Sequence, residues 1–152
     1  MIEGSNDPPI TKTKHMSTPK QNEFLLLFRG NAWYEGLSPE ELQQAMNQFK
    51  QWFDRLTDQG KLKAAQPLMR EGKIVSGKQG RVVADGPFAE SKEAVGGYFL
   101  IAVDTLEEAV AIAQTCPSLE YGTQVEVRPV AEECPMATHT RQQVAEEQLT
   151  AA

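Results

Sequence analysis

Two short apolar runs limit what this chain can fold into more than any other feature of its sequence. They are Glu23–Arg29, with the letters EFLLLFR, and Gly97–Val103, with the letters GYFLIAV. Because successive side chains of a strand point to opposite faces, an unbroken apolar run of this length predicts a strand that is covered on both faces. The chain therefore needs a sheet with two inner strands and a cover for each side of that sheet.

A long helix that could cover one face is predicted to begin at Ser38. A cap hydroxyl, a first-turn proline at Pro39 and an acidic residue at Glu41 form the signature of a capping box. Apolar residues then recur at helical spacing as far as Gly60, which can end the helix in a left-handed conformation. The expected apolar stripe comprises Leu42, Ala45, Met46, Phe49, Trp52, Phe53 and Leu56.

A second, shorter helix is predicted after the second apolar run. Thr105 and Glu108 repeat the capping pattern, and Pro117 ends the helix. The expected buried stripe comprises Leu106, Ala109, Val110, Ala113 and Cys116.

Further strands are predicted between and after these elements. Lys61–Leu68 is moderately apolar, Gly72–Gly80 has the composition of a short strand or turn, and Arg81–Ala84 predicts a returning strand. We therefore expect the middle section to form a hairpin. Thr123–Val130 alternates between valines and charged residues, which indicates a last strand with two different faces.

The order strand, helix, hairpin, strand, helix, strand predicts an α+β fold with a ferredoxin-like βαββαβ core. Two helices cover only one face of such a sheet, so the opposite apolar face needs another dry surface. A second copy of the chain is the simplest cover, and we expect a homodimer. This domain is predicted over residues 23–131, after a flexible N-terminal arm at 1–22 and before a C-terminal tail at 132–152 with a short helix near 141–149.

Charge and hydropathy exclude several classes of partner. The net charge of −6 and the pI of about 5.0 disfavour nucleic acid, because a polyphosphate backbone is repelled by an acidic surface. No stretch approaches the ~20 consecutive apolar residues of a membrane span, and the N-terminal sequence lacks the layout of a secretory signal. We therefore expect a cytoplasmic protein without a membrane partner.

The cysteines and histidines do not predict a metal site. Cys116 and Cys134 each precede a proline and have no Cys or His neighbour at ligand spacing, and His15 and His139 lie near the two ends of the chain. We expect free thiols, no structural metal and no cofactor.

Several separated blocks of the sequence resemble the DGPF-type branch of the YCII-related family. They are Asp85–Glu93 (DGPFAESKE), Gly96–Tyr98 (GGY) and Glu126–Pro129 (EVRP), in the family's order. The resemblance spans roughly 24–130 and implies a dimeric α/β-barrel. It also implies a site in which the motif aspartate, here Asp85, works with a histidine from early in the chain, and one relative removes chloride from a ring compound. No histidine lies within 24–130 of this chain, so the dyad itself is not carried over.

Asp85 is the candidate catalytic residue. It could act as a partly buried carboxylate base at the mouth of a cleft, or it could cap the Gly-Pro turn that follows it. Tyr98 could present its hydroxyl to the same cleft, or it could be a core residue with its oxygen at the edge.

Three charged residues are candidate ligand-binding groups. Glu126 and Arg128 project from one face of the last strand, and Arg29 ends the first. If that face is the dry one, these charges need partners, which either a small anion or an ion pair at the dimer interface would supply.

Two functions follow as hypotheses. The first is a dimeric protein that binds a small anionic or aromatic molecule, or serves a regulatory or accessory role through a protein partner. The alternative is a small cofactor-free enzyme of the lyase or dehydrochlorinase type, in which Asp85 abstracts a proton.

Overall fold

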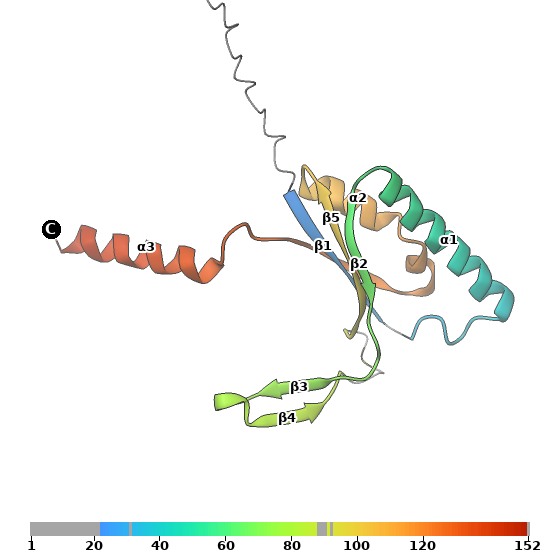
Figure 1. The fold of residues 1–152 in the computed structure, drawn as a ribbon, viewed down its shortest axis with the longest axis horizontal. Coiled ribbons are helices and arrows are strands. Elements are labelled where there is room, and N and C mark those ends of the chain that lie inside the picture. Colours follow the sequence, from blue (N-terminus) through green and yellow to red (C-terminus); the bar gives the residue numbers. More distant parts are fainter. Residues whose placement is uncertain (1–21, 31, 88–90, 92, 152) are drawn as a thin grey trace, which may run out of the picture.

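The structure is a computed structural model that describes residues 22–30, 32–87, 91 and 93–151. A four-stranded antiparallel sheet with two helices on one face forms the body, and a β-hairpin and a third helix project from it (Figure 1). The elements in chain order are β1 (Asn22–Arg29), α1 (Pro39–Asp58), β2 (Leu62–Pro67), β3 (Lys73–Ser76), the 3-10 turn η1 (Lys78–Gly80), β4 (Val82–Asp85), β5 (Val95–Val103), α2 (Leu106–Gln114), the 3-10 turn η2 (Pro117–Tyr121), β6 (Gln124–Pro129) and α3 (Pro135–Thr150).

The main sheet has the strand order β2-β5-β1-β6, which is the order of a ferredoxin-like fold. β1 and β5 lie in the centre, as their two-sided apolar runs predicted. Leu26 of β1 lies opposite Phe99 of β5 and Val127 of β6, and all three side chains point toward the helices. The predicted α+β class and ferredoxin-like core are confirmed.

The capping box of α1 is present as the sequence predicted. The backbone N–H of Glu41 donates to Ser38 Oγ (3.2 Å), and the backbone N–H of Ser38 donates to Glu41 Oε2 (2.8 Å). At the other end Gly60 adopts a left-handed conformation with φ of 68°. The helix therefore begins and ends where local sequence signals place it.

Aromatic rings dominate the core between α1 and the sheet. Trp52 stacks on Phe99 with ring centroids 5.1 Å apart, and Phe28 meets both rings edge to face. The indole N–H of Trp52 donates to Thr115 Oγ1 (2.8 Å), which satisfies its buried polar atom. This bond also ties α1 to the end of α2.

The predicted stripe of α2 is partly wrong. Ala109, Ala113 and Cys116 are buried as expected, but Ile112 is buried in place of Leu106 and Val110, which are exposed. A nine-residue helix has few apolar positions, so a small error in its predicted rotation about the helix axis changes which of them face the sheet.

The hairpin is formed by other strands than the sequence predicted. Lys61–Leu68 was expected to belong to it, but β2 is an edge strand of the main sheet and pairs with β5. The hairpin consists of β3 and β4, which form their own two-stranded sheet. It is thus an insertion between the second and third strands of the ferredoxin-like core.

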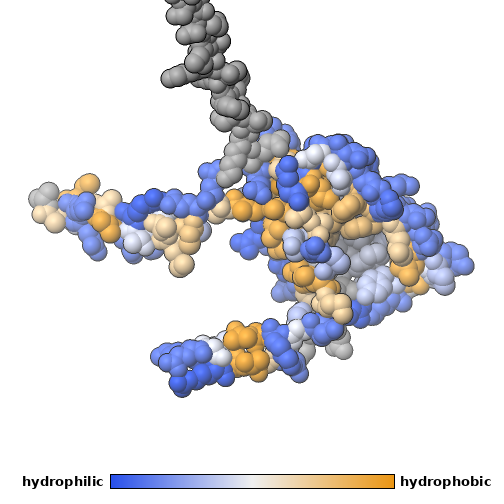
Figure 2. Space-filling model, in the orientation of Figure 1, coloured by the Kyte–Doolittle hydropathy of each residue, from blue (hydrophilic) through white to orange (hydrophobic). Residues whose placement is uncertain are grey.

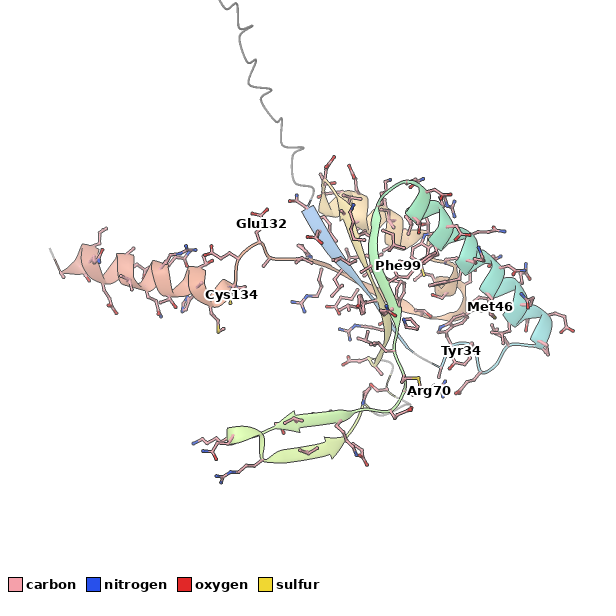
Figure 3. The ribbon with its side chains drawn as sticks, viewed as in Figure 1. Tyr34, Met46, Arg70, Phe99, Glu132 and Cys134 are labelled. Atoms are coloured by element: carbon pink, nitrogen blue, oxygen red, sulfur yellow. The ribbon has the colours of Figure 1, made fainter. Side chains whose placement is uncertain are left out.

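The two terminal segments compare differently with the prediction. The tail helix is longer than expected, and each of the described residues of α3 is exposed. Figure 3 shows Cys134, at the start of α3, set apart from the body. The predicted flexible arm lies outside the described residues, except for Asn22, which belongs to β1.

Among the helices of the described residues, none is long and apolar enough to cross a lipid bilayer.

Candidate functional site

The sheet face that points away from α1 and α2 carries most of the predicted site. Its central strands contribute Leu25 and Leu27 from β1 and Tyr98 and Leu100 from β5, all half-buried. In the part of the chain that the structure describes, no helix packs on this face (Figure 1). Figure 2 shows apolar residues along this side of the body, beside the open space between the hairpin and α3. We refer to it as the uncovered face.

Strand pairing fixes the arrangement of polar groups on the uncovered face. Leu27 lies between Tyr98 on one neighbouring strand and Glu126 on the other. One step along the sheet, Leu25 has Arg128 opposite it on β6. Directly opposed residues of an antiparallel pair share a face, so these polar groups surround an apolar floor.

Arg29 and Glu126 form an ion pair at one end of this floor. Nε and Nη2 of Arg29 donate to Glu126 Oε2 at 3.0 and 2.5 Å, with 28% and 32% of the two side chains exposed. The hydrogen bond and the attraction of Glu126 raise the pKa of the Arg29 guanidinium. The two charges thus neutralise each other within one chain, whereas the ion pair that the sequence predicted was one at a dimer interface.

Strand alternation also places the carboxylate of Glu23 on this face, and Arg128 lies diagonally across from it on β6. The side chain of Arg128 is exposed, and it forms no ion pair with any residue that the structure describes. Because Arg29 is paired with Glu126, Arg128 is a cation on this face that remains available to an anion. An anionic group is therefore a ligand that Arg128 can hold by a charge-assisted hydrogen bond.

Asp85 lies elsewhere in the chain. It is the last residue of β4, its side chain is 87% exposed, and its carboxylate pairs with the ammonium of Lys73 across the hairpin. The partial burial expected for a base in a cleft is therefore not found within one chain. The structure brings together Arg29, Tyr98, Glu126 and Arg128 on one face, and leaves Asp85 on the projecting hairpin.

A second polar cluster, which sequence reasoning missed, joins the loop after β1 to the base of the hairpin. Nη1 of Arg70 pairs with Glu35 Oε1 (2.6 Å), Nη2 donates to the hydroxyl of Tyr34 (3.0 Å), and the guanidinium lies over the Tyr34 ring (Figure 3). Trp33 stacks on Tyr121 with centroids 5.4 Å apart. These aromatic residues therefore pack against the protein itself, and their long-range partners left no local signal.

Other surface features do not join the predicted site. A shallow hollow lies on the solvent side of α1 and is lined by Pro39, Glu40, Gln43, Gln44 and Asn47. Within the described ranges, no group of three or more His, Cys, Asp and Glu residues is placed to hold a metal ion. The chemistry available on the uncovered face is thus that of a tyrosine hydroxyl, an ion pair, the carboxylate of Glu23 and one cationic arginine.

The family comparison matches the chain to the YCII-related domain over residues 19–137. No curated protein matches the sequence. Among solved structures, the chain is similar to 5-chloro-2-hydroxyhydroquinone dehydrochlorinase from Burkholderia phenoliruptrix, in complex with 2,5-dihydroxybenzoquinone, with 15% identity over 73% of this chain and 95% of that chain and a TM-score of 0.41. It is also similar to a hypothetical protein from Arabidopsis thaliana, with 15% identity over 79% of this chain and 97% of that chain and a TM-score of 0.34. These scores are too low to transfer a site or a ligand.

Proposed function

The chain belongs to the YCII-related domain family, and from that premise we propose that it is a homodimeric binding protein for a small anionic aromatic molecule, with a regulatory or accessory role. The site would lie between the uncovered faces of two copies. The observation that carries the proposal is the half-buried Arg29–Glu126 ion pair beside an apolar floor, on a face that no helix of the described residues covers.

The physical reason for a dimer is the apolar floor. Contact between exposed leucine side chains and water is unfavourable, and a second apolar face packed on them removes that contact. A neutralised ion pair tolerates such a dry space far better than two single charges would. Two identical faces related by a two-fold axis meet both requirements.

The physical reason for an anionic aromatic ligand is the combination of Arg128 and Tyr98 around Leu25 and Leu27. A flat ring fits an apolar floor, a carboxylate or phenolate meets the guanidinium of Arg128, and a ring hydroxyl meets the hydroxyl of Tyr98. Small-molecule sites commonly combine such a floor with a few polar groups that fix orientation.

The enzyme alternative has less support. Asp85 is solvent-exposed and paired with Lys73, whereas a base that abstracts a carbon-bound proton works best when water is excluded. His139 lies on α3 and is exposed, so no described histidine stands beside Asp85.

Binding assays with Arg128→Gln test the proposal, with Arg55→Gln on the exposed side of α1 as the matched control. Calorimetry with benzoate and hydroxybenzoates, and with benzamide as the neutral analogue, measures the affinity. We expect Arg128→Gln to lower the affinity for the anions by about tenfold or more, as the loss of a charged hydrogen bond predicts. The affinity for benzamide, and all affinities of the control variant, should change little. Equal affinity of both variants for every anion would remove Arg128 from the site, and a wild-type monomer in light scattering at micromolar concentration would remove the shared cavity.

A further inference from the structure

Within the part of the chain that the structure describes, the β3–β4 hairpin projects from the body as an arm and forms a sheet of its own (Figure 1). Its strands pair with each other in a two-stranded sheet, and an isolated hairpin of this size is marginal in water. The chain returns to its starting point, because the backbone N–H of Gly86 donates to the carbonyl oxygen of Gly72 (3.1 Å). Its larger apolar side chains are nevertheless exposed; they are Ile74, Val75, Val82 and Val83.

The two faces of the hairpin differ. Lys73 pairs with Asp85 and Val75 with Val83, so these four side chains share one face. On the other face Ile74 folds back over the hairpin's own base, where its Cδ1 lies 2.4 Å from the position that a Cβ on Gly86 would occupy. The Val75–Val83 face, with these residues 62% and 61% exposed, is thus the freer one.

The position of the arm indicates what it would contact. The hairpin and α3 project from the body toward the side of the uncovered face and leave an open space between them (Figures 1 and 2). A second copy whose uncovered face met this one would bring its body into that space. The arm and the uncovered face would then be parts of one continuous surface.

Charge favours the same occupant. The hairpin carries Lys73, Lys78 and Arg81 against the single acid Asp85, while the whole chain has a net charge of −6. A basic arm on an acidic chain is attracted to the acidic remainder of a second copy.

We propose that the Val75–Val83 face of each hairpin packs against the second copy at the rim of its uncovered face, and so delivers Lys73 and Asp85 to the partner's site. Each site would combine Tyr98 and Arg128 of one chain with the Lys73–Asp85 pair of the other. This inference rests on the proposed homodimer, and it adds which segment crosses over and which residues it carries.

Two neighbouring valines provide a matched test. Val83→Ser changes the proposed docking face, and Val82→Ser makes the same chemical change on the opposite face, where its cross-strand partner is already Ser76. Sedimentation equilibrium measures the dimer dissociation constant of the full chain. We expect Val83→Ser to raise it by about tenfold or more and Val82→Ser to change it less than about threefold, because only the first removes apolar area from the interface. Equal effects of the two changes would overturn the face assignment.

Excision of residues 73–85 tests the arm as a whole. Because Gly72 and Gly86 are already hydrogen-bonded, a short glycine-serine link can join them without displacing β2 or β5. We expect a folded body, by far-UV circular dichroism, whose dimer is weakened more than that of Val83→Ser. An excised protein that dimerises as tightly as wild type would overturn the inference and leave the homodimer intact, whereas a monomeric wild type would remove both.

Isotope-mixed cross-linking identifies the chain that the arm contacts. Light and heavy proteins are mixed, exchanged and treated with a carbodiimide, which joins lysine amines to carboxylates. Peptides that link Lys73 or Lys78 of one isotope to a carboxylate outside the hairpin of the other support exchange of the arm. Hairpin cross-links confined to single-isotope pairs would show that the arm folds onto its own chain and would overturn the inference. Retention of the full chain on nucleic acid, if it were lost when the hairpin is excised, would also overturn the inference.

Discussion

Leu26 and Leu27 are adjacent in β1 and point to opposite faces of the sheet, so replacing each with alanine separates the stability of one chain from the stability of the proposed dimer. Leu26 is fully buried against the helices, whereas Leu27 lies half-buried on the uncovered face. The two substitutions delete the same atoms from the same strand. Any difference between them therefore reports on what covers each face.

The magnitudes follow from burial. Leu26→Ala opens a cavity in a packed core, and we expect it to lower the free energy of unfolding by about 3 kcal/mol at every protein concentration. Leu27 is already partly shielded by its neighbours in the sheet, so a second face removes only the remaining exposure, worth about 1 kcal/mol per leucine. A two-fold dimer contains two such leucines, so Leu27→Ala should weaken it by about 2 kcal/mol, or roughly thirtyfold in the dissociation constant.

Urea unfolding at two protein concentrations and sedimentation equilibrium measure both quantities. The wild-type unfolding midpoint should rise with protein concentration, because association stabilises the folded state by mass action. Leu26→Ala should keep this dependence, and Leu27→Ala should lose most of it below the new dissociation constant. A wild-type midpoint independent of concentration, together with a dissociation constant unchanged by Leu27→Ala, would refute the argument that a second chain covers this face.

Three further predictions concern the body of the chain. Ser38→Ala should lower the free energy of unfolding by about 1 kcal/mol in urea titrations, because it removes the cap of α1, and a loss near zero would contradict that role. Trp52→Phe should lower the free energy of unfolding by about 2 kcal/mol, since it deletes ring contacts and leaves Thr115 Oγ1 without its donor. Adding Thr115→Val to this variant should lower the free energy of unfolding little further. Thiol labelling should modify exposed Cys134 quickly and buried Cys116 only on unfolding. Because burial raises the pKa of the Cys116 thiol, the unfolded chain loses this proton at a lower pH than the folded chain does. The free energy of unfolding should therefore fall as the pH rises above about 8.5.

Local sequence signals predicted the body of the fold well. The unbroken apolar runs correctly identified β1 and β5 as the two central strands of the sheet, because near-continuous apolar runs are typical of inner strands. The capping box at Ser38 located the start of α1 to the residue. These predictions succeeded because each depends on residues close together in the chain.

Predictions that depend on distant partners were weaker. β2 was assigned to a hairpin because it precedes two further strand-like segments, yet its partner is β5, some 35 residues away. On the uncovered face, alternation correctly placed Glu126 and Arg128 together, but it could not show that Glu126 pairs with Arg29. The partners of Asp85 and Arg70 depend on the path of the hairpin, which no local pattern encodes.

The position of Asp85 changes how the motif that begins with it is understood. A Cβ on Gly72 would lie 2.8 Å from the backbone carbonyl oxygen of Gly86, so Gly72 is needed where the two ends of the hairpin meet, and a Cβ on Gly86 would displace the side chain of Ile74. One of these glycines directly follows Asp85 in the DGPF stretch. The motif is therefore placed to set the direction in which the hairpin leaves the sheet. Delivery of Asp85 to a second copy by this hairpin, as proposed above, would account for its exposure in a single chain.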